Sequence, residues 1–213
     1  MKALFQPEIA QVNLKYNVEY QLRDKNGNIK QLFQENKLNR MIFSFFRKFV
    51  KPISKDGQVK KGLFNYLAAY GLRIPGITGN WQDKIVIANL ITTAGKAGAA
   101  SRINGSGSEA AFTYIGVGTG ITAADVANTT LETEIIDSGL ARVNATASRV
   151  TTTVTNDTAQ LTTTFSVSGT KAITESGLLN AASIGVLLCR QVFTAINVVS
   201  GDSLTITWKV KCS

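Results

Sequence analysis

The sequence predicts an all-β fold, an antiparallel β-sandwich of jelly-roll-like or immunoglobulin-like form, with two short helices inserted after an N-terminal β-hairpin. Two observations predict it. The last eleven residues, 203–213, alternate between polar and apolar side chains, which is the pattern of a half-buried antiparallel strand. After residue 84 the chain holds 22 of its 23 threonines and breaks into short strand-like runs, at the spacing of roughly 8–12 residues that is typical of sandwiches and barrels.

The chain opens with a predicted β-hairpin in residues 1–36, which would join the body. From Val12 to residue 22 every second side chain is apolar, so one face of this strand is expected to be buried. The turn contains Asn26-Gly27, a pair that tolerates the positive φ angles of a tight hairpin. The return strand is expected from Ile29 to about Glu35.

The period of the apolar residues changes after the hairpin. Residues 37–51 predict an amphipathic helix that ends before Pro52, and residues 63–70 predict a second short helix that ends at Gly71. The apolar positions of the first helix are Leu38, Met41, Ile42, Phe45, Phe46 and Phe49. Residues 75–110 are rich in glycine and are expected to be irregular, with one short strand candidate at 84–90. Residues 37–112 are therefore interpreted as a basic helical and irregular insertion.

Residues 113–213 are expected to form a Thr-rich β-sandwich body, which together with the preceding segments makes one compact domain. The expected strands are 114–118, 140–155, 160–167, 173–179, 186–192 and 204–212. A loop is expected at 119–128, a short helix or strand at 131–136, and a turn at Ser168-Gly169.

The net charge of +9 is concentrated in one part of the chain. Residues 1–84 hold 15 Lys and Arg against 6 Asp and Glu, whereas residues 85–213 hold 8 of each. The first 84 residues also hold 12 of the 17 aromatic side chains. A basic, aromatic region is expected to contact an acidic protein surface, nucleic acid or lipid headgroups.

The sequence carries little catalytic chemistry. It has no histidine, which excludes Ser-His-Asp and Cys-His catalysis and the usual zinc sites. The run Gly116-Val-Gly118-Thr-Gly120 lacks the features of a nucleotide loop, so a strand exit with closely packed backbones is expected. We therefore expect no enzyme activity, no cofactor and no metal.

Three carboxylates, Glu132, Glu134 and Asp137, lie close together but lack the spacing of a calcium loop. A solvated loop face is expected there in preference to a metal or acid/base cluster. An enzyme that cleaves glycans would need two facing carboxylates. We expect alanine at Asp137 or at Glu175 to leave assembly intact.

Cys189 and Cys212 both fall in apolar strand patterns. Two buried free thiols are expected in preference to a cross-strand disulfide, which stays open as the alternative. No apolar run is long enough to span a membrane, and the N-terminus lacks the features of a secretory signal.

The helix at 37–51 has three alternative uses: packing on the β-body with its Lys and Arg solvated, docking in a partner protein, or lying on a membrane. The residues that would form a partner interface are Arg40, Phe45, Phe46, Arg47, Lys48, Phe49 and Lys51. Sequence-specific nucleic-acid binding is not expected, because no recognised binding motif is present.

Residues 114–134 read Tyr-Ile-Gly-Val-Gly-Thr-Gly, then a loop of small residues, then Thr-Thr-Leu-Glu-Thr-Glu. This segment resembles one found in virion structural proteins of tailed bacteriophages, the minor-tail or fibre-associated β-sandwich family with the motif Ile-x-x-Gly-Thr-Gly. Residues 173–179, 187–193 and 200–208 are similar to that family, as is the hairpin at 23–28 followed by Asn36. The resemblance covers most of the chain, and residues 37–112 are its least typical part.

The resemblance implies a virion component in the tail or head–tail connector region, assembled in the bacterial host cytoplasm as a symmetric homo-oligomer. Its partners would be other virion proteins and copies of itself. One alternative is a capsid decoration protein on the head shell. Another is a receptor- or glycan-binding fibre module, which would need exposed aromatic side chains on loops. The body carries its five aromatic residues mostly in strand patterns: Phe112, Tyr114, Phe165, Phe193 and Trp208.

Overall fold

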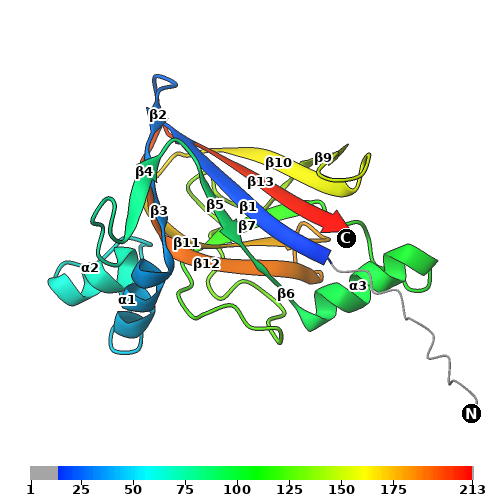
Figure 1. The fold of residues 1–213 in the computed structure, drawn as a ribbon, viewed down its shortest axis with the longest axis horizontal. Helices are drawn as coiled ribbons and strands as arrows, with labels where there is room; N and C mark the ends of the chain where they lie inside the picture. The colour runs from blue at the N-terminus through cyan, green and yellow to red at the C-terminus, as the bar shows by residue number, and fades with distance from the viewer. Residues whose placement is uncertain (1–13, 213) are drawn as a thin grey trace, which may run out of the picture.

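A computed structural model describes residues 14–212, which form a mostly β protein with antiparallel sheets and three short helices (Figure 1). The six-stranded sheet has the order β2-β1-β13-β10-β9, with β5 also paired to β1. Its strands are β1 (Leu14–Arg23), β2 (Ile29–Lys30), β5 (Ile85–Ala88), β9 (Thr146–Val150), β10 (Thr158–Ser166) and β13 (Ser203–Cys212). The predicted first strand starts at Val12, which lies outside the described residues.

The five-stranded sheet has the order β6-β12-β11-β7-β8, and a separate pair joins β3 to β4. The five strands are β6 (Leu90–Ile91), β7 (Tyr114–Gly118), β8 (Val143–Asn144), β11 (Lys171–Leu179) and β12 (Leu187–Val198). The pair consists of β3 (Leu32–Glu35) and β4 (Gly79–Gln82), and the helices are α1 (Lys37–Arg47), α2 (Leu63–Tyr70) and α3 (Thr93–Asn104). Helices α1 and α2 lie together at one end of the two large sheets, which we call the body, and α3 lies at the other end (Figure 1).

The main core is formed by side chains from both large sheets. On β13 the predicted alternation is confirmed, because Leu204, Ile206 and Trp208 are fully buried. Tyr20 of β1 contacts Phe193 of β12 with ring centroids 4.7 Å apart, so the two sheets share one cluster. Full burial of one large apolar side chain stabilises the fold by about 1.5–3 kcal/mol.

The first hairpin has the predicted turn but a shorter return strand. Asp24 accepts hydrogen bonds from the Asn26 and Asn28 amides, and Gly27 has a φ of 84°. The predicted continuous strand from Ile29 to Glu35 is wrong. It is divided into β2, which pairs with β1 at two positions, and β3, which pairs with β4. The reason is a long-range contact, since β5 occupies the edge of β1 from Asn17 to Tyr20.

Residues 75–110 are more regular than the sequence predicts. They contain β4 and α3, and the strand candidate at 84–90 becomes β5 and β6. Thr92 caps the start of helix α3, because its hydroxyl accepts a hydrogen bond from the Gly95 amide. Gly105, in the left-handed conformation, caps the end of the helix. The glycines that argue against a helix let it pack closely, because Gly95 lies against the Leu188 backbone and Gly98 against the Phe112 ring.

Three smaller predictions are also corrected. Helix α1 ends at Arg47 rather than at residue 51. Residues 131–136 form neither a helix nor a strand, and only a single bridge joins Glu134 to Gly118. Both cysteines are free, but Cys189 is buried whereas Cys212 is exposed at the end of β13. Burial raises the pKa of the Cys189 thiol.

No helix within residues 14–212 is long and apolar enough to cross a lipid bilayer.

Replacing Gly95 with Ala tests the close packing of α3. Alanine is the better helix former by about 0.8–1 kcal/mol, but a β carbon at this position would overlap the Leu188 carbonyl oxygen. We expect Gly95→Ala to destabilise the protein by about 1–3 kcal/mol in urea unfolding. Lys96→Ala, at the exposed neighbouring position, is the control and should stay within about 0.5 kcal/mol of wild type. A more stable Gly95→Ala variant would contradict this packing.

Candidate interaction surface

Helix α1 is attached to the rest of the protein by polar groups on its inward side. The Asn36 side chain accepts from the Asn39 amide and so caps the first turn. Asn39 is fully buried, accepts from the Leu72 amide at 2.7 Å and donates to the Tyr70 carbonyl at 3.1 Å. The start of α1 is therefore tied to the end of α2.

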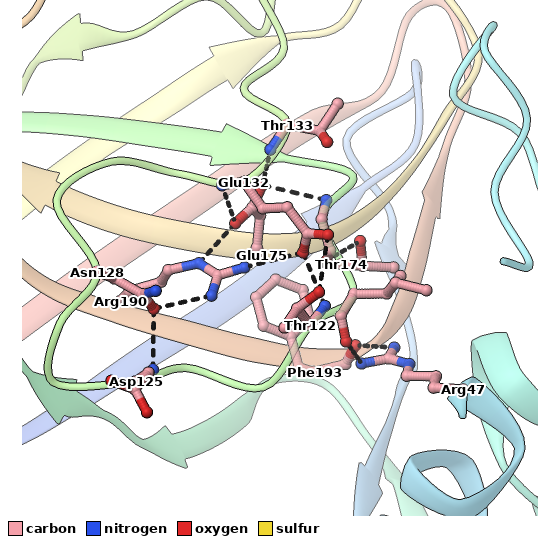
Figure 2. Close-up of polar contacts among 12 residues, drawn as sticks. Arg47, Thr122, Asp125, Asn128, Glu132, Thr133, Thr174, Glu175, Arg190 and Phe193 are labelled. Carbon is pink, nitrogen blue, oxygen red and sulfur yellow. Dashed lines mark hydrogen bonds and ion pairs between the residues drawn. The ribbon is translucent and has the colours of Figure 1, made fainter.

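Arg47, at the last turn of α1, points inward rather than to solvent. Its guanidinium donates to the Phe193 carbonyl at 2.9 Å (Figure 2). It also donates to the carbonyls of Ala68 at 2.9 Å and Ile121 at 3.3 Å, and it lies over the Phe43 ring. Burial lowers the pKa of Arg47 to about 10, so the side chain remains charged at neutral pH. The prediction that this residue is solvated is wrong, because it joins α1 to α2, to β12 and to the loop after β7.

Arginines also cover the free edge of β12. Beyond its two pairs with β6 at Cys189 and Arg190, β12 directs backbone carbonyls toward the helices. Arg47 donates a hydrogen bond to the Phe193 carbonyl, and Arg73 donates one to the Ala195 carbonyl at 3.1 Å. Exposed strand edges promote unwanted pairing, so these side chains protect the edge.

The apolar side of α1 is exposed. Phe45 and Phe49 are 54% and 69% exposed, and Phe64 of α2 is 61% exposed. Phe45 contacts both Phe49 and Phe46, and Phe46 stacks on Phe64 with centroids 5.7 Å apart. We call these four phenylalanines the aromatic face. The helix packs on the body, as one of the three alternatives expects, but it does so through Asn39 and Phe43 and leaves its apolar stripe in solvent.

The remaining predicted interface residues differ in exposure. Lys48 and Lys51 are exposed, and Arg40 is half-exposed. The Arg40 Nε lies 3.6 Å from a carboxylate oxygen of Glu35, which is buried in β3. Burial raises the pKa of Glu35, although a hydrogen bond from Thr194 and the charges of Arg40 and Arg47 oppose the shift.

A buried ion-pair network holds the loop after β7 (Figure 2). Glu175 of β11 has no solvent exposure and accepts from the backbone amides of Gly120, Glu132 and Thr133 at 2.7–3.1 Å. Arg190 of β12 donates to Glu175 at 2.7 Å. The same arginine also donates to Asn128 and Glu132. Residues 119–135 are thereby fixed to the five-stranded sheet.

The glycine-rich run is part of this network. A β carbon at Gly118 or at Gly120 would collide with the Glu175 carboxylate. The predicted close packing at this strand exit is therefore confirmed, and its physical reason is a buried charge. Sequence reasoning missed Glu175 and Arg190 as a pair. The available signal was the presence of one acidic and one basic residue in two otherwise buried strands, since buried charges need partners.

The loop carboxylates are paired, and two of the three are also exposed. Arg142 binds Glu134 through two hydrogen bonds of 2.7 and 2.8 Å. Burial opposes ionisation of Glu132, but hydrogen bonds from Thr122 and the charge of Arg190 hold the pKa of this carboxyl below its usual value. The predicted solvated face is confirmed for Glu132 and for Asp137, which contacts Lys171, whereas Glu134 is half-buried in its pair with Arg142. Across residues 14–212 no group of three or more Cys, Asp or Glu side chains is placed to hold a metal ion.

Alanine substitutions at Glu175 and Asp137 test the buried network. Removal of the Glu175 side chain would leave the Arg190 charge and three backbone amides without this acceptor. We expect Glu175→Ala to lower the free energy of unfolding by about 3–5 kcal/mol. Asp137→Ala is the matched control and should change it by less than about 1 kcal/mol. Equal effects of the two substitutions in urea unfolding would contradict the network.

Glu35 makes stability depend on pH. A raised pKa means that the folded protein holds the proton more tightly than the unfolded chain. Stability from this group is therefore present below the ordinary carboxyl pKa of about 4.3 and is lost as pH rises through the folded pKa. Urea unfolding from pH 4 to 7 should show Glu35→Gln gaining stability relative to wild type. Glu19→Gln, a half-exposed carboxylate of β1, removes the same charge as a control. A Glu35→Gln curve parallel to wild type would contradict the assignment.

Comparison of the chain with protein-family models, with curated proteins and with solved structures finds no match. What the aromatic face binds is therefore inferred from its own residues.

Proposed function

We propose that this protein is a structural component of a tailed-bacteriophage virion, in the tail or head–tail connector region. It acts by docking on other virion proteins and by symmetric self-assembly, without catalysis. The observation that carries the proposal is the aromatic face, which α1 and α2 present to solvent from one end of a mostly β body.

The aromatic face has the composition of a docking site. Neighbouring exposed aromatic side chains are rare on isolated soluble proteins and are enriched at protein interfaces. Each phenylalanine that a partner covers would contribute about 1.5–3 kcal/mol. The helices that carry the face are held by Arg47 and Asn39, so little ordering would be required when a partner binds.

The charge distribution favours a different protein as the occupant of the aromatic face. Lys48 and Lys51 are exposed and lie within two residues of Phe49 in the sequence, and the first 84 residues carry all of the net positive charge. Two copies that met through this face would repel each other, whereas an acidic neighbour would be attracted. Copies of the chain would meet instead through the body, whose residues after 84 have balanced charge.

The body supports a scaffold role. Its two antiparallel sheets share one hydrophobic cluster, which fits a β-sandwich, the architecture that we propose. The motif that resembles phage structural proteins supplies the loop network: Gly118 and Gly120 leave room for Glu175, and Glu134 pairs with Arg142. A motif that maintains a loop fits a structural family better than an active site.

Two alternatives differ in copy number and ligand. A capsid decoration protein would cover the head shell, so its copy number would follow that of the shell subunits. A receptor- or glycan-binding fibre module would bind host surface sugars. Trp81 is exposed, but it packs edge-on against Phe33, so the aromatic face remains the stronger indication.

The test measures incorporation into virus particles purified from the bacterial host. Phe45→Ser combined with Phe49→Ser should keep the circular dichroism of wild type but reduce the particle-bound copy number at least tenfold, because a partner would lose two buried aromatic groups. Ile103→Ser combined with Ile184→Ser is the matched control, because both residues are highly exposed on other elements. A small fixed copy number in quantitative mass spectrometry favours the tail or connector.

Two results would overturn the proposal. One is a wild-type chain that never sediments with particles. The other is a folded phenylalanine double variant that enters particles at the wild-type level.

A further inference from the structure

A groove of about 1040 Å³ lies beside α1, and none of the four phenylalanines of the aromatic face lines it. One wall comes from α1 and the segment after it, and consists of Lys37, Arg40, Met41, Phe43, Ser44, Arg47, Lys48, Lys51, Ile53, Ser54 and Lys55. The other consists of residues 119–124 of the loop after β7, and the lining also includes residues 88–90, Glu132, Thr133, Gln191 and Val192. We call this feature the basic groove.

The two walls of the basic groove differ in charge. Lys37, Lys48, Lys51 and Lys55 line one wall, and within residues 14–212 none of them forms an ion pair. The opposite wall is neutral and presents small and apolar side chains such as Ile121, Ala123 and Ala124. Glu132 is the one carboxylate in the lining, and it is engaged by Thr122 and Arg190.

The lining also contains an unpaired amide. The Asn89 side chain lies between β5 and β6, and neither of its polar atoms finds solvent or a hydrogen-bond partner in the described part of the chain. Buried amides that lack partners are costly, so nearly all are satisfied in folded proteins.

We propose that the basic groove binds an acidic, amphipathic polypeptide segment of another protein. The acidic side chains of the segment would face the lysines, and its apolar side chains would face Ile121 and the alanines. None of the four phenylalanines of the aromatic face lines the groove, and the inference does not depend on the phage assignment.

Nucleic acid fits the basic groove less well. Phosphates run along both strands of a duplex and along every nucleotide of a single strand, so their binding favours cations on all sides. Here the cations occupy one wall, and the opposite wall is neutral. A second copy of this chain is also disfavoured, because its net charge of +9 matches the sign of the groove.

The dimensions suit a short segment. The eleven residues of α1 extend about 16 Å along the helix axis. An extended polypeptide advances about 3.3 Å per residue, so about five residues would lie beside the helix. The groove volume is at the upper end of the range for small-molecule pockets, about 300–1,000 Å³, which also favours a segment of several residues.

Fluorescence anisotropy with a labelled dodecapeptide that alternates Glu with Leu tests the proposal. In an extended conformation this probe has one acidic and one apolar side. We expect saturable binding, weakened at least tenfold in a Lys48→Glu and Lys51→Glu double variant. Lys60→Glu combined with Lys61→Glu changes the net charge equally but outside the lining, and should retain affinity within about twofold. Circular dichroism verifies that both variants fold.

The comparison probes are a Lys-Leu dodecapeptide and a single-stranded 12-nucleotide DNA. Tighter binding of the DNA, equal effects of the two charge variants, or no binding of the acidic peptide would overturn the proposal. The Phe45→Ser and Phe49→Ser variant should still bind the peptide, since those side chains do not line the groove. This variant separates a failure of the basic groove from a failure of the proposed docking function.

Discussion

The positions of the loop after β7 and of helix α1 depend on the burial of the Glu175 carboxylate. A charge without solvent contact costs several kcal/mol unless all of its hydrogen-bond positions are filled. Here they are filled by Arg190 and by three backbone amides of residues 119–135. The loop after β7 therefore has one stable position, and Thr174 fixes it further by donating to the Gly120 carbonyl.

This loop in turn determines where α1 lies. The Ile121 carbonyl, next to Gly120, is one of the three acceptors of Arg47. Arg47 also reaches Phe193 of β12 and Ala68 of α2, so a single side chain joins the loop, the sheet and both helices. Because α1 is attached through Arg47 and Asn39, its apolar stripe is not needed for packing and remains free for a partner. The same loop forms the neutral wall of the basic groove.

Local pattern was sufficient to locate the long strands but not the bounds of the short ones or the contacts between distant residues. Alternation located β1, β10 and β13, and Asn26-Gly27 located the first turn. Helix α3 was missed because its glycines lower helix propensity and serve close packing, which only the neighbouring Leu188 and Phe112 reveal. The predicted interface includes Phe45 and Phe49, which are exposed, and Arg47, whose inward position the sequence could not show because its acceptors lie 21 to 146 residues away. The partners of Glu175 are likewise 15 to 55 residues away.

The central claim is that the aromatic face is open in the isolated protein and covered in its assembly. Hydroxyl-radical footprinting with mass spectrometry measures the solvent contact of individual aromatic side chains, and fully buried Trp208 provides an internal reference. We expect Phe45, Phe49 and Phe64 to be oxidised readily in the free protein and protected in purified particles. Equal oxidation of these residues in both states, or protection already in the free protein, would contradict the account.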